Sequence, residues 1–154
     1  MPSKIDARLA ELGITLTEAS APAANYVPFV ISGTTVYVSG QVSRNPGGLI
    51  MGKLGAGVSV EDGAAAAATC AHQLIGQLKA ASGGDLDRVK RVVKLTGFVN
   101  SAPDFTDQPK VVNGCSDVFV AVFGEAGRHA RSAVGVAALP LGVAVEVEGV
   151  FEIA

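Results

Sequence analysis

The stretch that decides the fold is residues 130–153, ARSAVGVAALPLGVAVEVEGVFEI. It holds two β-rich runs, at about 130–138 and 143–153, and the LPLG segment between them has the length and composition of a hairpin loop. Along the second run apolar side chains alternate with three glutamates, which therefore share one face of the strand. These glutamates are Glu146, Glu148 and Glu152. The patterns predict two terminal strands joined as a hairpin.

The register of this hairpin decides which side chains meet. If Ala138 pairs with Val143, Arg131 lies on the same face as Glu146 and Glu148. Three further positions of that face carry small or apolar residues: Ala133, Gly135 and Val150. A guanidinium and two carboxylates would then converge beside space for a ligand. A slip of one residue abolishes the convergence, and Glu148 can take the place of Glu146 in another register.

Outward from this stretch, periodicity predicts three more strands and two long helices. The strands are expected at 27–31, 34–39 and 88–99, and the helices from Ser59 to residues 82–84 and from Asp107 to Gly124. The expected order is ββαβαββ, an α/β (α+β) fold in which two helices cover one face of a mixed sheet. The strands carry apolar residues on both faces, so the uncovered face needs a partner, expected to be another copy of the chain.

The segment 45–57 is rich in glycine and is expected to form a mobile loop. Its GKLGAG motif resembles a phosphate-binding loop only superficially, because no Ser or Thr follows Lys53 and the glycine spacing is wrong. Ser59 with Asp62 resembles a capping box that opens the first long helix. On that helix His72 falls among polar residues, so a solvated surface histidine is expected.

The two cysteines give no metal-ligand spacing, and Cys115 falls on the apolar stripe of the second long helix. Cys70 and Cys115 are therefore expected to be buried thiols. No metal and no organic cofactor is implied.

Length and charge limit the functional class. With 154 residues, 49% of them hydrophobic, the chain is expected to form a single domain over 1–154, with residues 1–20 as an N-terminal extension packing on the core. A formal net charge of -2 and the absence of a basic stripe argue against nucleic acid as the main partner. The N-terminus lacks the apolar core of a signal peptide, and no apolar run is long enough to span a membrane. A soluble, cytoplasmic protein without a membrane partner is expected.

Several separated motifs together resemble the RidA (YjgF-like) family, formerly labelled endoribonuclease L-PSP. The most specific is the run 130–140, ARSAVGVAALP, followed by VEVE at 145–148. Others are APAA at 21–24 with Tyr26 soon after, SGQ at 39–41 and GFV at 97–99. The N-terminal extension and the glycine-rich segment resemble a longer branch of this superfamily.

The resemblance implies a chorismate-mutase-like fold assembled as a homotrimeric barrel, with ligand clefts at the subunit boundaries. It also implies hydrolysis of reactive 2-imino or enamine acids to 2-keto acids and ammonia, as by a 2-iminobutanoate/2-iminopropanoate-type deaminase. A 2-imino acid presents a planar carboxylate, to which arginine supplies two hydrogen bonds where lysine supplies a point charge. Arg131 is therefore expected to anchor the carboxylate, and Glu146 to hold water or exchange protons with the departing nitrogen.

The resemblance extends to the residues around that anchor. Tyr26 would border the cleft, and Ser39 and Gly40 would line it. Ala133, where many imine-deaminating members carry cysteine, and His129, where proline or alanine is more usual, are also expected to contact the substrate, and His129 could tune Arg131 or a ligand. Each has a purely structural alternative: Arg131 as an interface ion pair, Glu146 as a solvated carboxylate, Tyr26 as a packing aromatic, Ser39 as a turn former and His129 as a packing residue.

Two rival functions remain open at this stage. One is a non-catalytic protein that uses the Arg131 cleft to bind a small carboxylate such as a 2-keto acid. The other is an endoribonuclease or translation inhibitor, against which the acidic balance and the lack of a paired-histidine site argue.

Overall fold

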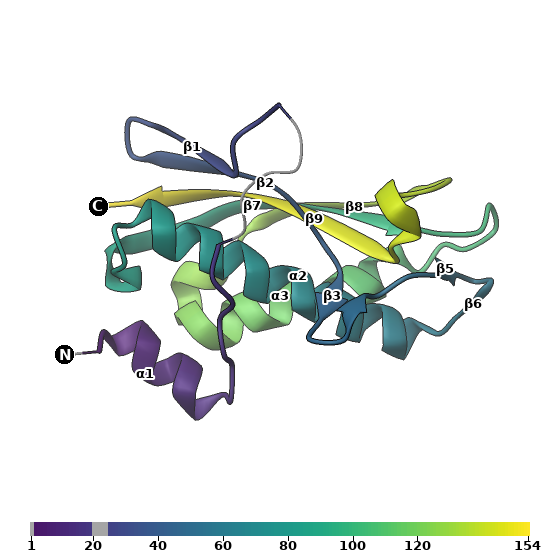
Figure 1. The fold of residues 1–154 in the computed structure, drawn as a ribbon, viewed down its shortest axis with the longest axis horizontal. Helices are drawn as coiled ribbons and strands as arrows, with labels where there is room; N and C mark the ends of the chain where they lie inside the picture. Colours follow the sequence, from purple (N-terminus) through teal and green to yellow (C-terminus); the bar gives the residue numbers. More distant parts are fainter. Residues whose placement is uncertain (1, 20–24) are drawn as a thin grey trace.

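The computed structural model describes residues 2–19 and 25–154, and its centre is a five-stranded sheet in the order β1-β2-β9-β7-β8 (Figure 1). The strands are β1 (Phe29–Ser32), β2 (Thr35–Val42), β7 (Val89–Asn100), β8 (Ala130–Val136) and β9 (Val145–Ile153). Only β7 and β8 pair in parallel, and the other neighbours are antiparallel. The predicted mixed sheet is confirmed.

Two long helices, α2 (Val60–Ala81) and α3 (Gln108–Phe123), cover one face of this sheet, and no helix of residues 2–19 and 25–154 covers the opposite face (Figure 1). The core lies between the helices and the sheet, where Leu74, Phe119 and Phe151 are fully buried. The order ββαβαββ with both helices on one face is thus confirmed. The described residues also form three short 3-10 helices, at Leu86–Arg88, Gly124–Gly127 and Pro140–Gly142.

Small side chains allow α2 and α3 to approach closely. A Cβ atom added to Gly114 of α3 would lie 2.0 Å from the carbonyl oxygen of Ala64 on α2. The N-terminus of α2 is capped by Ser59, whose hydroxyl accepts a hydrogen bond from the Asp62 N–H at 3.1 Å. Only this half of the expected capping box forms. His72 lies on the outer side of α2, as its polar neighbours predict, but it is partly buried rather than fully solvated.

The predicted hairpin between the two terminal strands is wrong. β8 and β9 are both paired with β7, which lies between them, so they share no hydrogen bonds with each other. The LPLG segment instead forms a longer connection, with a 3-10 turn at Pro140–Gly142 and Leu141 at a positive φ of 60°. β7, from the middle of the chain, lies beside β9 at the position where the predicted hairpin would have put β8.

The glycine-rich segment is more ordered than expected. It contains four two-residue strands in two pairs: β3 (Arg44–Asn45) with β4 (Gly48–Leu49), and β5 (Lys53–Leu54) with β6 (Gly57–Val58). The Lys53 ammonium group donates hydrogen bonds to the Asn100 side-chain oxygen at 2.6 Å and to the Ala137 carbonyl at 2.5 Å. These bonds occupy the lysine of the GKLGAG motif, in agreement with the rejection of a phosphate loop.

The N-terminal helix α1 (Lys4–Glu11) lies on the far side of α2 and α3 from the sheet (Figure 1). The Asp87 carboxylate accepts hydrogen bonds from the N–H groups of Lys4 and Ile5, both at 3.0 Å, and so caps this helix. An ion pair of 2.9 Å joins Asp6 to Lys79 of α2. No helix within the described ranges has both the length and the apolar character needed to cross a membrane.

Candidate functional site

Arg131 lies on the edge strand β8 and points to the helix-covered side of the sheet. Its pairing partner Leu95 on β7 is fully buried under the helices, and paired residues share a face. The guanidinium group donates from Nη1 to the Asn113 Oδ1 atom at 2.7 Å and to the Ser116 hydroxyl at 3.2 Å, both on α3. None of the ion pairs among the described residues involves Arg131. Its positive charge is therefore oriented by neutral groups and left without a carboxylate.

His129 joins this arrangement through Ser116. The ring Nδ1 lies 2.6 Å from the Gly127 carbonyl oxygen, which can only accept, so Nδ1 carries the proton. In the neutral ring Nε2 then accepts from the Ser116 hydroxyl at 2.9 Å. A directed chain therefore runs from Arg131 through Ser116 to His129. We call these residues, with Asn113, the Arg131 cluster.

Ala133 and Gly135 follow Arg131 on the same face of β8, opposite Gly97 and Val99 of β7. Ala133 is partly buried and packs against the hydrophobic core. At Gly135 an added Cβ would lie 2.6 Å from both the Ser101 hydroxyl and the Gln108 side-chain nitrogen. Neither residue borders the glutamates of β9, as the predicted hairpin required.

Glu146 lies on the uncovered face of the sheet, opposite Phe98 of β7 and Val42 of β2. Its carboxylate is close to Gly40, where an added Cβ would lie 2.3 Å from Oε1. Burial, and secondly repulsion by Glu148, raises the pKa of Glu146 above its usual value. The carboxyl group is thus poised to take up a proton more readily than a solvated glutamate.

A β-bulge at the predicted Ser39 and Gly40 places Gly40 against this carboxylate. Between the pairs Val38 with Gly149 and Gln41 with Val147, two residues of β2 oppose one residue of β9. The Ser39 hydroxyl donates to the Val27 carbonyl at 2.7 Å, next to Tyr26, whose side chain is exposed. We call Ser39, Gly40 and Glu146 the Glu146 cluster.

The predicted convergence of Arg131 with Glu146 does not occur within one chain. Arg131, Ala133 and Gly135 pair with residues of β7 that face the helices, whereas Glu146 and Glu148 pair with Phe98 and Thr96, which face away. The two clusters are therefore on opposite faces of the sheet. The cause is that β7 lies between β8 and β9. β8 therefore pairs in parallel with β7, and the predicted antiparallel pairing of β8 with β9 does not form.

The sequence reading did not identify Asn113 and Ser116. Both lie on α3, on the same helix face as Pro109, whose backbone carbonyl accepts from Arg131 Nη2 at 3.5 Å. Positions 109, 113 and 116 are spaced four and three residues apart, so they lie on one face of the helix. This spacing was the sequence signal that could have identified Asn113 and Ser116. The expected match at 21–24 lies outside the described residues.

The described residues contain no group of three or more His, Cys, Asp or Glu side chains arranged to hold a metal ion. Both cysteines are buried free thiols, as expected. Burial raises the pKa of Cys70 and of Cys115, so neither thiol ionises readily.

Comparison with known proteins places this geometry in a family. Residues 6–152 match the family described as "YjgF/chorismate mutase-like, putative endoribonuclease". The chain is 56% identical over 152 residues to Protein TCP17 of Trypanosoma cruzi, covering 97% of this chain and 94% of that protein.

Two solved structures illustrate the breadth of the similarity. The Agrobacterium tumefaciens protein Atu1372, of unknown function, is 48% identical, with a TM-score of 0.91, and the match covers 97% of this chain and 92% of that one. RidA from the Antarctic bacterium Psychrobacter is 33% identical, with a TM-score of 0.56, over 90% of this chain and 98% of that one.

Proposed function

The chain belongs to the YjgF/chorismate mutase-like family, and from this membership we propose that it hydrolyses reactive 2-imino or enamine acids to 2-keto acids and ammonia. The observation that supports this function is the state of Arg131. Its guanidinium is held by neutral oxygens and has no carboxylate partner among the described residues. A substrate carboxylate supplies that partner.

The reaction needs a water molecule and a group that moves protons. Water adds to the imine carbon, the C=N bond breaks as the C=O bond forms, and both water hydrogens leave on nitrogen as ammonia. Glu146, with its raised pKa, can accept a proton from the attacking water and return it to the departing nitrogen. Ser116 and Asn113 act as positioning residues, because their hydrogen bonds fix the guanidinium before substrate binds.

The site is proposed to lie between subunits of a homotrimer. Since the Arg131 cluster and the Glu146 cluster are on opposite faces of one sheet, a ligand that meets both needs a second copy of the chain. The uncovered face also exposes apolar side chains suited to burial in such an assembly, among them Val30, Tyr37 and Val134. Tyr26, also exposed, would border the cleft.

The test is hydrolysis of an imine generated in situ by an amino-acid oxidase. We expect the protein to accelerate loss of the imine and Arg131→Ala to abolish this acceleration while the oligomer persists. Arg131→Lys keeps the charge but loses the paired hydrogen bonds, and we expect it to lose at least about tenfold in kcat/KM. Arg128→Ala is the matched control, because Arg128 is exposed and pairs only with Glu125 among the described residues.

The rival function, binding without turnover, gives a different result in the same experiment. It predicts no acceleration for several imines, together with calorimetric binding of a 2-keto acid that Arg131→Ala removes. Unchanged turnover in Arg131→Ala would contradict the assigned role of Arg131 itself.

A further inference from the structure

Within the Arg131 cluster, Ser116 and His129 are arranged as a nucleophile with its base. The distance from Ser116 Oγ to His129 Nε2 is 2.9 Å, within the reach that a general base needs. The Gly127 carbonyl, 2.6 Å from Nδ1, keeps the ring proton on Nδ1, so Nε2 is the free acceptor. A serine, a histidine base and a third group that orients the base are the parts of an activated serine nucleophile.

The pair lies at an open edge of the molecule. β8 is the last strand of the five-stranded sheet, and Ser116 and His129 are both only partly buried. Asn113, one helical turn before Ser116, is exposed, and so is Ala130, next to His129. A small molecule can therefore approach the Ser116 hydroxyl from this edge.

Arg131 places a positive charge beside the nucleophile. Its Nη1 atom donates to Ser116 Oγ at 3.2 Å, which uses one lone pair of the hydroxyl oxygen and leaves the other for attack. The hydrogen bonds to Asn113, Ser116 and the Pro109 carbonyl occupy three of the five N–H groups of a guanidinium. The Nε–H and one Nη2–H have no partner among the described residues, and they can donate to an oxyanion that forms next to Ser116.

We propose that Ser116 is an acyl-accepting nucleophile with His129 as its general base, and that this site hydrolyses small carboxylic esters. The bond from Ser116 Oγ to the carbonyl carbon forms while the hydroxyl proton moves to His129 Nε2, and Arg131 stabilises the resulting oxyanion. The C–O bond to the leaving group then breaks, and the proton on Nε2 passes to the departing alcohol. Water cleaves the acyl-serine in the same way, with His129 taking a water proton and returning it to Oγ. The overall change is ester plus water to acid plus alcohol.

This activity is separate from the proposed deamination. It needs neither Glu146 nor a second copy of the chain, because Ser116, His129 and Arg131 are joined by hydrogen bonds within one chain. Modification of Ser116 can therefore fail while imine hydrolysis succeeds, and the reverse.

The test is covalent labelling of the full-length protein with diisopropyl fluorophosphate, followed by peptide mass spectrometry. We expect the label on Ser116, where the Oγ–phosphorus bond forms and fluoride leaves, and hydrolysis of p-nitrophenyl acetate by the unlabelled protein. Ser116→Ala should lose both the label and the ester hydrolysis. His129→Gln should slow labelling at least about a hundredfold, since a general base contributes about 10²–10⁴ in rate.

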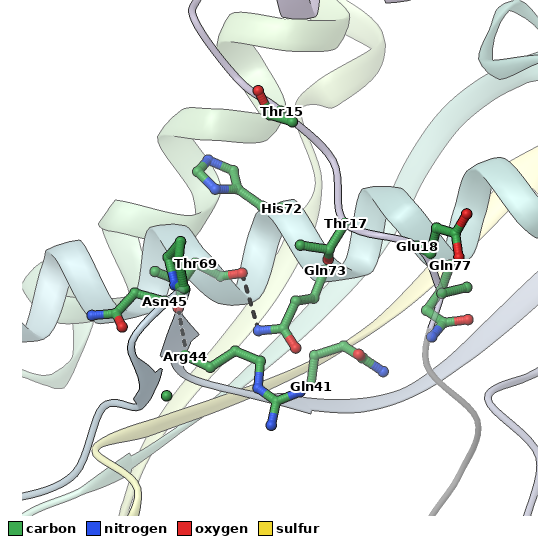
Figure 2. A pocket seen from close by; sticks show the side chains of 13 residues that line it. Thr15, Thr17, Glu18, Gln41, Arg44, Asn45, Thr69, His72, Gln73 and Gln77 are labelled. Carbon is green, nitrogen blue, oxygen red and sulfur yellow. Dashed lines mark hydrogen bonds between the residues drawn. The ribbon is translucent and has the colours of Figure 1, made fainter.

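The chain offers a matched control for each variant. Ser132 is exposed on β8 directly after Arg131, and Ser132→Ala should be labelled at Ser116 as the wild type is. His72, the other histidine, lines a cavity beside α2 that contains no residue of the Arg131 cluster, so His72→Gln should also react normally (Figure 2). The proposal is overturned if Ser116 stays unlabelled in the wild type, if His129→Gln is labelled at the wild-type rate, or if Ser116→Ala hydrolyses the ester as fast as the wild type.

Discussion

At the scale of single residues, the candidate site depends on side chains that orient one another. Arg131 is the most informative residue of the sequence, yet its direction is set by Asn113 and Ser116 on another element. His129, unusual beside the motif, is engaged through both ring nitrogens, with Ser116 and with the Gly127 carbonyl. It therefore orients the serine that orients the arginine, a role in which an imidazole can hardly be replaced by proline.

Glu146 should make stability depend on pH. Burial, followed by repulsion from Glu148, raises its pKa, so the folded protein holds the proton more tightly than the unfolded chain. The protonated Glu146 therefore adds to the free energy of unfolding. This stabilisation is complete below the pKa that Glu146 has in the unfolded chain and is lost as the pH rises through its pKa in the folded protein. Glu146→Gln has no proton to lose, so it should be more stable than the wild type at neutral pH. The difference should vanish below about pH 4.

Urea unfolding of both proteins between about pH 4 and pH 8 checks this expectation. Glu148→Gln serves as the control, because removing the charge of Glu148 lowers the pKa of Glu146 in the folded protein. In this background the stability difference at neutral pH between proteins with and without Glu146→Gln should be smaller. Stability profiles of wild type and Glu146→Gln that run parallel across the range would contradict it.

At the scale of elements, the close approach of α2 and α3 depends on Gly114. Gly114→Ala places a methyl group against the Ala64 backbone oxygen, and the two helices must move apart. We expect overpacking to cost roughly 1–3 kcal/mol and the gain in helix propensity to offset about 1 kcal/mol of this, a net loss of up to about 2 kcal/mol. Thermal and urea unfolding measure the change.

Asp117→Ala is the control on the same helix, at an exposed position. It should change stability by less than about 0.5 kcal/mol. A Gly114→Ala protein as stable as this control would show that the helices adjust without cost.

The elements themselves were predictable from the sequence, whereas their pairing was not. Alternation and helical periodicity are local, and they located β7, β8, β9, α2 and α3 to within a few residues. The LPLG segment has hairpin chemistry, but the place beside β8 is taken by β7, through a parallel pairing that no local pattern encodes.

The candidate site was predictable to the same extent. Arg131, Ser39, Gly40 and Glu146 could be selected by motif, and the bulge places Gly40 against Glu146. The partners of Arg131 on α3 depend on how a helix packs across the edge of the sheet, which sequence spacing does not reveal.

At the scale of the whole molecule, the Arg131 and Glu146 clusters lie on opposite faces of the sheet, so the proposed site needs more than one copy of the chain. We expect light scattering coupled to gel filtration to show a trimer, and its dissociation on changing Val134 to Asp, which puts a charge on the exposed apolar face. In a closed ring each copy would present its Arg131 cluster to one neighbour and its Glu146 cluster to the other.

This arrangement can be tested by mixing two inactive variants. Arg131→Ala and Glu146→Gln are each expected to lack turnover, but a mixed trimer contains one boundary where an intact arginine meets an intact glutamate. Random assembly from equal amounts should then restore about a quarter of the wild-type activity per subunit, because about three quarters of the trimers are mixed and each has one intact site of three. Mixing Arg131→Ala with the double variant should restore none. If the first mixture also stays inactive while mass spectrometry shows mixed trimers, both residues act from the same chain, and the proposed division of the site between copies is wrong.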